Sequence, residues 1–271
     1  MPTPVQPLRP ASSRAASARR AALGRAALGA LALLGLAACT RPEGALPPGV
    51  SVEDLPDQET WDARLDASVG SDPELAMRAP YAAHYDRPDT TYTYLGPAPG
   101  AADSLAERPA VELTLYADAQ PTATVRAVRA WLYERSGDLE AVGRVTADVT
   151  AGDGARLQAA RLTVADGGAF RASGGTVADF GGRNAARVRA RTLAGTLEGS
   201  RYTAEGDVTV DAGGRTLTAG RVVWDGRRFR APGAFSFVGP GERVRGVGLV
   251  ATADLSRYSF SRAQGQIEVQ E

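Results

Sequence analysis

The chain has 271 residues, and its 31 basic side chains, all arginine, balance 31 acidic ones. Five of the arginines and none of the acids precede Cys39, so removing residues 1–38 would leave 26 arginines and a net charge of −5. That charge excludes a nucleic-acid or anionic-membrane binder that works by bulk charge. A single Cys and a single His exclude a disulfide framework and any site built from several Cys or His ligands, and the lack of lysine excludes lysine-based catalysis.

The first 38 residues have the organisation of an export signal. Residues 1–25 are rich in Arg, Ala and Pro, and an uncharged run of 13 residues, Ala26 to Ala38, follows them. This run suits the apolar part of a signal peptide, but it is shorter than the about 20 residues that cross a bilayer. It ends in Leu36-Ala37-Ala38-Cys39, and the polar, Pro-rich stretch TRPEGALPPG comes next.

This ending resembles the lipobox of bacterial lipoproteins, with Leu at −3, small residues at −2 and −1, and then Cys. In that family the Cys thiol receives a diacylglyceryl group, the peptide is cut before the Cys, and the new amine is acylated. The resemblance implies a signal peptide at 1–38 and an exported chain whose acylated Cys39 tethers it to a membrane. An uncleaved helix with an incidental buried Cys is the alternative. Thr40 replaces the Asp that retains enterobacterial lipoproteins at the inner membrane, which leaves the retaining membrane open.

Composition divides the rest of the chain into a tether and a folded domain. Residues 39–75 are rich in Pro, Asp, Glu and Ser with weak periodicity, which predicts a flexible tether after the lipidated Cys. Residues 76–100 hold four Tyr and predict a strand or two, and residues 96–110 predict a loop. We therefore expect the folded domain to cover residues 76–271.

From Val111 onward, strict alternation of apolar and polar residues predicts half-buried β-strands. The longest alternating runs are 139–150 and 202–212, and the shorter ones are 111–115, 186–190, 235–237 and 267–269. Gly-rich turns separate the runs at hairpin-like intervals, at 166–168, 181–182 and 212–214. Convincing helical spacing is missing from this part of the sequence. The pattern predicts an all-β domain.

Two segments of this region repeat one scheme. Ala141 to Val145 and Ala204 to Val208 both read Ala-x-Gly-x-Val, and each leads through a Gly-containing turn to Leu-x-Ala-x-Arg-(Leu/Val), at 157–162 and 217–222. A fainter copy lies around Ser173 to Val177. A hairpin with one apolar face must stack on a neighbour to bury that face. The repeat predicts an open β-jellyroll of stacked antiparallel hairpins, or a short open-ended solenoid.

Three stretches of the repeat region resemble a known family: Val111 to Ala130, Tyr202 to Trp224 and Gly239 to Val269. They are similar to the strand pairs of the LptA/LptC/OstA-like β-jellyroll superfamily of lipopolysaccharide transport, above all to LptC in its lipobox-bearing versions. The likeness covers about residues 105–271. Two features depart from the family: Cys39 stands in for the transmembrane helix common in LptC, and residues 165–200 exceed one repeat, which leaves room for an extra hairpin.

The resemblance implies transport in which no bond is made or broken, with no catalytic residue, metal or cofactor. The cargo would be lipopolysaccharide or a related glycolipid, with its acyl chains in an apolar interior and its sugars in water. The candidate lining residues are Val145, Val149, Leu157, Val208, Val210, Leu217, Trp224, Phe235 and Phe237. Any one of them could equally fill an ordinary closed core.

The family also implies partners at the open ends of the domain. One end would meet the permeases of an inner-membrane ABC transporter, and the other an LptA-like periplasmic bridge. An exposed last strand invites strand addition, and Gly265, Gln266, Ile267 and Val269 form a candidate edge without a blunting Pro. The expected location is the periplasmic side of the inner membrane, with the outer membrane as the alternative.

The remaining groups of polar residues are more typical of structural roles than of functional sites. Arg183, Arg187, Arg189 and Arg191 occupy alternate positions, as a solvated strand face does, although they could also contact lipid phosphates. His84 lies among Tyr side chains without a Gly-x-Ser-x-Gly elbow or an HExxH motif. A structural β-solenoid lipoprotein, a lipid-modifying β-barrel enzyme and a lipidated LptA-like bridge are the alternative functions.

Overall fold

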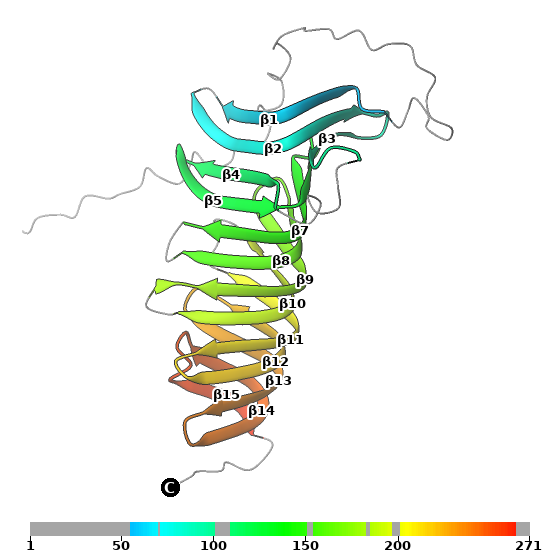
Figure 1. Cartoon of the computed structure of the whole chain (residues 1–271). Coiled ribbons are helices and arrows are strands. Elements are labelled where there is room, and N and C mark those ends of the chain that lie inside the picture. Colours follow the sequence, from blue (N-terminus) through cyan, green and yellow to red (C-terminus); the bar gives the residue numbers. More distant parts are fainter. Residues whose placement is uncertain are drawn as a thin grey trace, which may run out of the picture. The chain divides into compact units, whose positions relative to one another are not determined.

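The structure is a computed structural model that describes residues 55–69, 71–100, 109–150, 154–182, 185–196 and 201–263. All of them belong to one of the two units of the chain, Ala38–Glu271. These residues form fifteen strands and no α-helix, and every strand pairing is antiparallel. The predicted all-β, open jellyroll-like fold is confirmed, because the alternating runs pair as neighbouring strands of one sheet (Figure 1).

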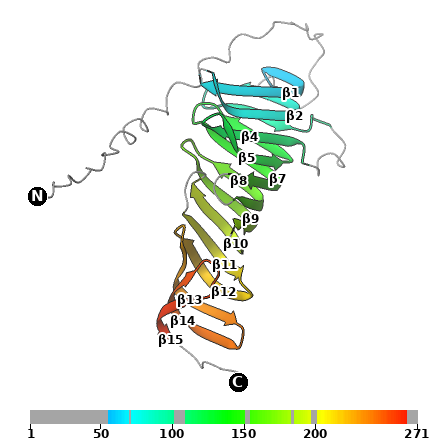
Figure 2. The ribbon, with the colours of Figure 1, turned by 90° about the vertical axis from the view of Figure 1, so that its left-hand side faces the viewer.

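The strands succeed one another along the sheet almost in chain order. They are β1 (Gln58–Val69), β2 (Asp72–Asp86), β3 (Thr91–Gly96), β4 (Val111–Ala117), β5 (Gln120–Ala127), β6 (Arg129–Tyr133), β7 (Asp138–Val149), β8 (Ala155–Val164), β9 (Ala169–Phe180), β10 (Ala186–Thr196), β11 (Tyr202–Ala212), β12 (Arg215–Trp224), β13 (Arg228–Gly239), β14 (Glu242–Thr252) and β15 (Tyr258–Ala263). From β7 to β15 each strand pairs with the next one along the chain (Figure 2). Residues 165–200, predicted to leave room for an extra hairpin, contain the β9–β10 hairpin of this series.

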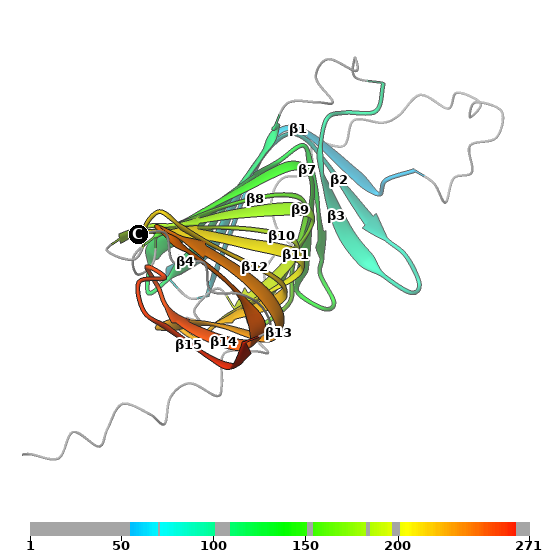
Figure 3. The same cartoon turned by 90° about the horizontal axis from the view of Figure 1, so that it is seen from below.

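The long strands fold over near their midpoints, and the two halves enclose a common interior (Figure 3). Pairing registers shift at this corner, for example between Val142 and Val145 on β7. Buried side chains lie on both sides of the shift, as Leu139 and Ala141 do before it and Val145 and Ala147 after it. The sheet therefore buries one face against itself, which explains how a single alternating sheet obtains a core.

Glycines of the repeated Ala-x-Gly-x-Val scheme form the corner. Gly143, Gly174 and Gly206 have φ values of 84°, 83° and 81°, a left-handed conformation that costs other L-residues about 1–2 kcal/mol. Lack of space for a side chain requires glycine at this corner as well. A Cβ on Gly174 would lie 2.5 Å from the Cβ of Ala160 on the neighbouring strand. The repeat found in the sequence is thus the repeat of the strand corner.

The boundary predicted between tether and domain at residue 75 is wrong, because β1 and the start of β2 lie before it. Trp61, Ala63, Leu65 and Ala67 alternate with charged residues along β1. The acidic and Pro-rich composition around this stretch concealed that period. The predicted last strand at 265–269 lies outside the described residues, as do Cys39 and Arg183.

Candidate functional site

An uninterrupted row of apolar side chains crosses the interior over nine neighbouring strands. We call it the inner row: Ala82, Leu95, Ala130, Ala141, Leu162, Ala172, Leu193, Ala204 and Val222, each paired in register with the next. All nine residues are buried. Because large and small residues are mixed along the row, side chains from the facing strand halves can pack between them.

The predicted lining residues lie in this interior. Seven are buried: Val145, Leu157, Val208, Val210, Leu217, Phe235 and Phe237. Val210, Leu217 and Phe237 are register partners on consecutive strands. Val149 and Trp224 are half-buried at strand ends. The structure thus places all nine on or beside the apolar face, and their contact with a lipid stays a prediction.

A small apolar cavity of about 40 Å³ remains in the interior between β4 and β11. Its walls include two predicted residues, Val149 and Leu157, and small side chains such as Ala178. By the volume that one water requires, the cavity holds only about three waters. An acyl chain therefore needs side chains to move before it can enter.

Three aromatic rings that the sequence analysis did not single out also line this cavity. Phe170 and Phe180 lie near the two ends of β9, and Tyr202 begins β11. The Tyr202 ring centroid lies 5.5 Å from that of Phe180 and 6.0 Å from that of Phe170. The Tyr202 ring thus contacts an aromatic ring near each end of the folded β9 strand. Burial raises the pKa of Tyr202.

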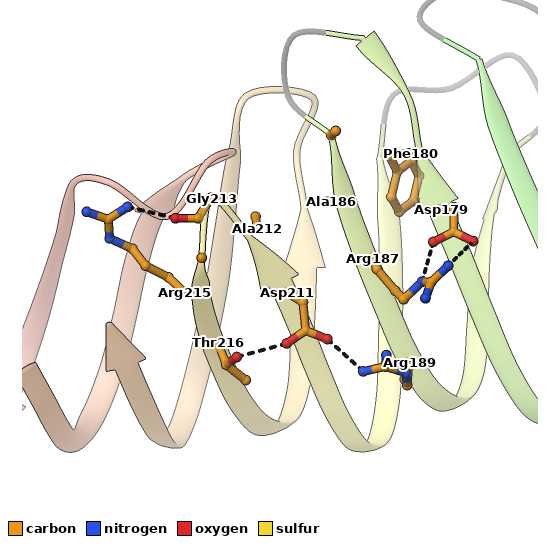
Figure 4. A pocket seen from close by; sticks show the side chains of 12 residues that line it. Asp179, Phe180, Ala186, Arg187, Arg189, Asp211, Ala212, Gly213, Arg215 and Thr216 are labelled. Atoms are coloured by element: carbon orange, nitrogen blue, oxygen red, sulfur yellow. Dashed lines mark hydrogen bonds and ion pairs between the residues drawn. The ribbon is translucent and has the colours of Figure 1, made fainter. Parts of the chain in front are cut away.

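The surface between the β9–β10 and β11–β12 turns is hollowed by a groove of about 670 Å³ (Figure 4). Its walls carry two Arg–Asp ion pairs. Arg187 Nε lies 2.5 Å from Asp179 Oδ1, and Arg189 Nη1 lies 2.6 Å from Asp211 Oδ2. The hydrogen bond to Arg187 lowers the pKa of Asp179.

The predicted arginine stripe is ion-paired throughout its described part. Besides the two pairs of the groove, Arg191 Nη2 lies 2.8 Å from Asp207 Oδ2, outside the groove. Each of these three β10 arginines is thus paired with an aspartate on a neighbouring strand, β9 or β11. Such exposed pairs contribute little stability, about 0–1 kcal/mol each, and the stripe is a solvated strand face.

Arg215 also lines the groove, and its hydrogen bonding differs from that of the ion-paired arginines. Its Nη1 donates a hydrogen bond of 3.1 Å to the carbonyl oxygen of Gly213. Its Nε is buried and lacks a hydrogen-bond partner among the described residues. A buried donor without an acceptor costs about 1–3 kcal/mol. Because this Nε is buried, its unused hydrogen-bonding capacity is not exposed to the groove.

At the C-terminal end of the described sheet, the loop between β14 and β15 packs an apolar side chain into the interior. Leu255 is fully buried although its backbone is left-handed, with φ of 57°. Asp254 holds the loop, because its Oδ1 accepts hydrogen bonds from the Thr252 hydroxyl and from the amide and hydroxyl of Ser256. These bonds lower the pKa of Asp254 to about 2.

His84 takes part in a structural network at the N-terminal end. Its Nδ1 lies 3.0 Å from Glu134 Oε1, which also accepts a hydrogen bond from Thr93 Oγ1. His84 lies on β2 and Thr93 on β3, and Glu134 follows β6 in the turn that leads to β7. Among the described residues, no group of three or more His, Cys, Asp and Glu side chains could hold a metal. The same residues contain no helix long and apolar enough to cross a membrane.

Comparison with known proteins finds a match among solved structures. No protein-family model matches the chain, and no curated protein matches it. The crystal structure of LptH, the LptA-homologous periplasmic component of the lipopolysaccharide transport device from Pseudomonas aeruginosa, matches with 16% identity and a TM-score of 0.35. The match covers 38% of this chain and 76% of that chain. The fold of the present chain is accordingly established by its own strand pairing and register.

Proposed function

We propose that the protein is a membrane-tethered periplasmic component of lipopolysaccharide export. Its folded sheet would take a glycolipid from the permeases of an inner-membrane ABC transporter and pass it to an LptA-like bridge. The observation that carries the proposal is the inner row, an apolar track that crosses nine strands without a polar residue. The LptC-like motifs and the lipobox-like ending at Cys39 support it.

The physical chemistry of the track suits a moving lipid. Each buried CH₂ contributes about 0.8 kcal/mol, and this attraction has no preferred direction. An acyl chain can therefore advance along the row when another lipid pushes from behind, since every register partner offers a similar surface. Sugars and phosphates would remain in water at the open side of the fold.

Strand addition at the two ends would join the partners. Within the described residues, β1 pairs only with β2 and β15 only with β14. Unpaired strand edges accept strands from other chains. We assign the C-terminal edge, with Gly265, Gln266, Ile267 and Val269 beyond β15, to the bridge, and the membrane-proximal end to the transporter.

A photo-crosslinking amino acid in place of Val208 or Phe235, in living cells, tests the proposal. We expect an adduct to glycolipid that disappears when the transporter ATPase is blocked. The same group in place of Thr218, which is exposed on the other face of β12, is the matched control and should give no adduct. Folded, lipidated variants without an adduct at either interior site would contradict the proposal.

A structural β-solenoid lipoprotein of the cell envelope is the second candidate. The observation that favours it is the packed interior, where seven of the nine predicted lining residues are buried and the cavity is small. A purely structural core has no need to open. The crosslinking experiment separates the two candidates, because a structural core gives no ATP-dependent adduct.

A further inference from the structure

Aromatic side chains gather at the N-terminal end of the sheet, where β1, β2 and β3 lie (Figure 1). Ala82, Leu95 and Ala130 of the inner row occupy the alternate positions of β2, β3 and β6, so the aromatic residues of these strands stand on the opposite, outer face. We call this surface the aromatic face: Trp61, Tyr85, Tyr92, Tyr94, Trp131 and Tyr133. It holds six of the eleven Tyr and Trp residues of the chain.

The rings of the aromatic face pack on one another and still present surface outward. Tyr92 stacks on Tyr85 at a centroid distance of 4.8 Å. Tyr81, the buried register partner of Trp61, lies between two other rings, 5.6 Å from Trp61 and 6.2 Å from Tyr94. Trp61 is 62% exposed, and the other five members of the face are half-buried. Trp61 is therefore the most exposed ring of the face.

On later strands the outer face carries ion pairs instead. On β5, Arg126 lies 2.9 Å from Glu112 and 3.3 Å from Asp148, and β10 bears the ion-paired arginine stripe. Trp and Tyr combine an apolar body with a polar tip, and they concentrate where hydrocarbon meets water at a membrane surface. The outer face thus changes from ionic to interfacial chemistry toward the N-terminal end of the sheet.

The described chain begins at the aromatic face. Arg87 Nη2 donates a hydrogen bond of 2.6 Å to the carbonyl oxygen of Leu55, the first described residue, and Nη1 lies 3.0 Å from Asp57 Oδ2. The same guanidinium group lies over the Tyr85 ring, 5.1 Å from its centroid. Leu55 follows Cys39 by 16 residues, which span at most about 55 Å. A lipid on Cys39 would hold the face within this distance of the bilayer, and such tethering strengthens a weak contact.

We propose that the aromatic face docks on the headgroup region of the membrane that holds Cys39, with Trp61 as the main contact. The inference rests on the proposed function for the acyl anchor and goes beyond it, because it states which face of the sheet meets the bilayer. The contact depends on aromatic rings rather than on bulk charge, in keeping with the net charge of −5 after residue 38. The unpaired edge of β1 stays free for the transporter, and the inner row faces away from the bilayer.

Quenching of tryptophan fluorescence by brominated phospholipid tests the contact. The acylated chain is reconstituted in phosphatidylcholine vesicles with or without bromine on the acyl chains, and Trp131→Phe with Trp224→Phe leaves Trp61 as its only Trp. We expect bromine to lower the Trp61 emission about twofold, because an interfacial Trp lies beside the acyl chains. The control has Thr218→Trp on the outer face of β12 and Phe in place of all three native Trp. Its emission should be unchanged.

A second reporter on the same face locates the docking surface. With Trp131 as the only Trp, Trp61→Phe should preserve the quenching of Trp131, whereas Trp61→Ser should reduce it severalfold because the most exposed ring is lost. Val238→Ser in the Trp61→Phe chain is the matched control, since Val238 is the other exposed large apolar side chain of the described residues. It should leave the quenching unchanged. Equal quenching with Phe and with Ser at position 61 would refute this docking surface.

The outcomes separate the docking from the proposed function. An acylated, vesicle-bound chain whose Trp61 is not quenched would overturn the docking and leave the export function standing. A chain without an acyl group would contradict the anchor, and quenching of its Trp61 by added vesicles would still support the aromatic face as a membrane contact. Shielding of Trp61 from aqueous iodide by the purified transporter, but not by vesicles, would assign the face to a protein partner and overturn the proposal.

Discussion

Glycine is required at the strand corners for two separate reasons, a left-handed backbone and a lack of space for a Cβ. Three glycines of this chain allow the two reasons to be tested separately. Gly174 combines a left-handed backbone with a neighbour only 2.5 Å from the position of a Cβ. Gly175 has the same backbone conformation, φ of 84°, with nothing within 4 Å of that position. Gly220 has open space, and its φ lies outside the left-handed region. Conformational strain and steric overlap can therefore be measured one at a time.

We expect Gly220→Ala to change the free energy of unfolding by less than about 0.5 kcal/mol. Gly175→Ala should lower it by about 1–2 kcal/mol, the cost of a left-handed alanine. Gly174→Ala should lower it further, to about 3 kcal/mol in total, because the strands must also separate locally. Denaturant unfolding of the three variants measures the series. Equal values for Gly174→Ala and Gly175→Ala would show that close packing at the corner is not a constraint.

Asp254 gives the loop at the C-terminal end of the sheet a dependence on pH. Hydrogen bonds from Thr252 and Ser256 stabilise its charged form, so the pKa falls from 3.8 to about 2 in the folded chain. A lowered pKa contributes stability above pH 3.8 that is lost as the pH falls toward 2. The carboxylate is exposed, so solvent screening makes this contribution small.

We expect the melting temperature of the wild type to decrease between pH 4 and pH 2 more than that of Asp254→Asn. The amide of the variant keeps an acceptor oxygen for Thr252 and Ser256 but has no charge to lose. Thermal unfolding of both proteins across this range gives the comparison. Parallel curves would show that the charge of Asp254 does not stabilise the loop.

At the scale of elements, the β14–β15 loop acts as an apolar cap as well as a turn. Leu255 is fully buried, and Ala253 beside it is buried too. The β11–β12 turn lies against the loop, because a Cβ on Gly213 would be 2.7 Å from the carbonyl oxygen of Asp254. The loop thus covers apolar surface that the last strands alone would leave open to water.

Leu255→Ala should lower the free energy of unfolding by about 2–4 kcal/mol, since it removes a fully buried side chain from a site held by the Asp254 network. Val238→Ala on β13 is the control, because Val238 is 40% exposed and should cost less than about 0.5 kcal/mol. Denaturant unfolding measures both variants. A cost for Leu255→Ala no greater than that of the control would mean that the loop is no part of the cooperative core.

At the scale of the whole molecule, the proposed function depends on a segment outside the described residues. The proposed lipid on Cys39 would keep the domain at a membrane, since several acyl chains give stable anchoring. The chain from Cys39 to β1 is 19 residues long and spans at most about 65 Å when extended. The folded sheet would therefore work close to the membrane surface.

We expect Cys39→Ser to move the protein from the membrane fraction to the soluble periplasmic fraction, or to leave it as an uncleaved precursor. Wild-type protein should stay in the membrane fraction after a carbonate wash and should carry the mass of the acyl groups on its N-terminal peptide. Mass spectrometry and fractionation check both points. A mature, non-acylated wild-type chain in the soluble fraction would refute the lipoprotein assignment.

The sequence by itself determined the class of the fold. Its period of two, its Gly-rich turns and its repeated Ala-x-Gly-x-Val scheme predicted antiparallel strands, the hairpin positions and which residues face inward. Val210, Leu217 and Phe237 could be chosen as interior residues because alternation fixes the face of a strand, whatever its neighbours are. The first strand was missed although it alternates too, because its acidic composition suggested a tether.

Only the tertiary structure decided what the corner glycines do and which aromatic rings meet across the interior. A glycine within an alternating run looks like any small residue, and its left-handed backbone appears only when the strand folds over to bury its own second half. Phe180 contacts Tyr202 on a strand that is not its neighbour, and the local alternation of residues does not predict such a contact. Sequence period fixes the face of each strand, whereas long-range packing fixes which faces meet.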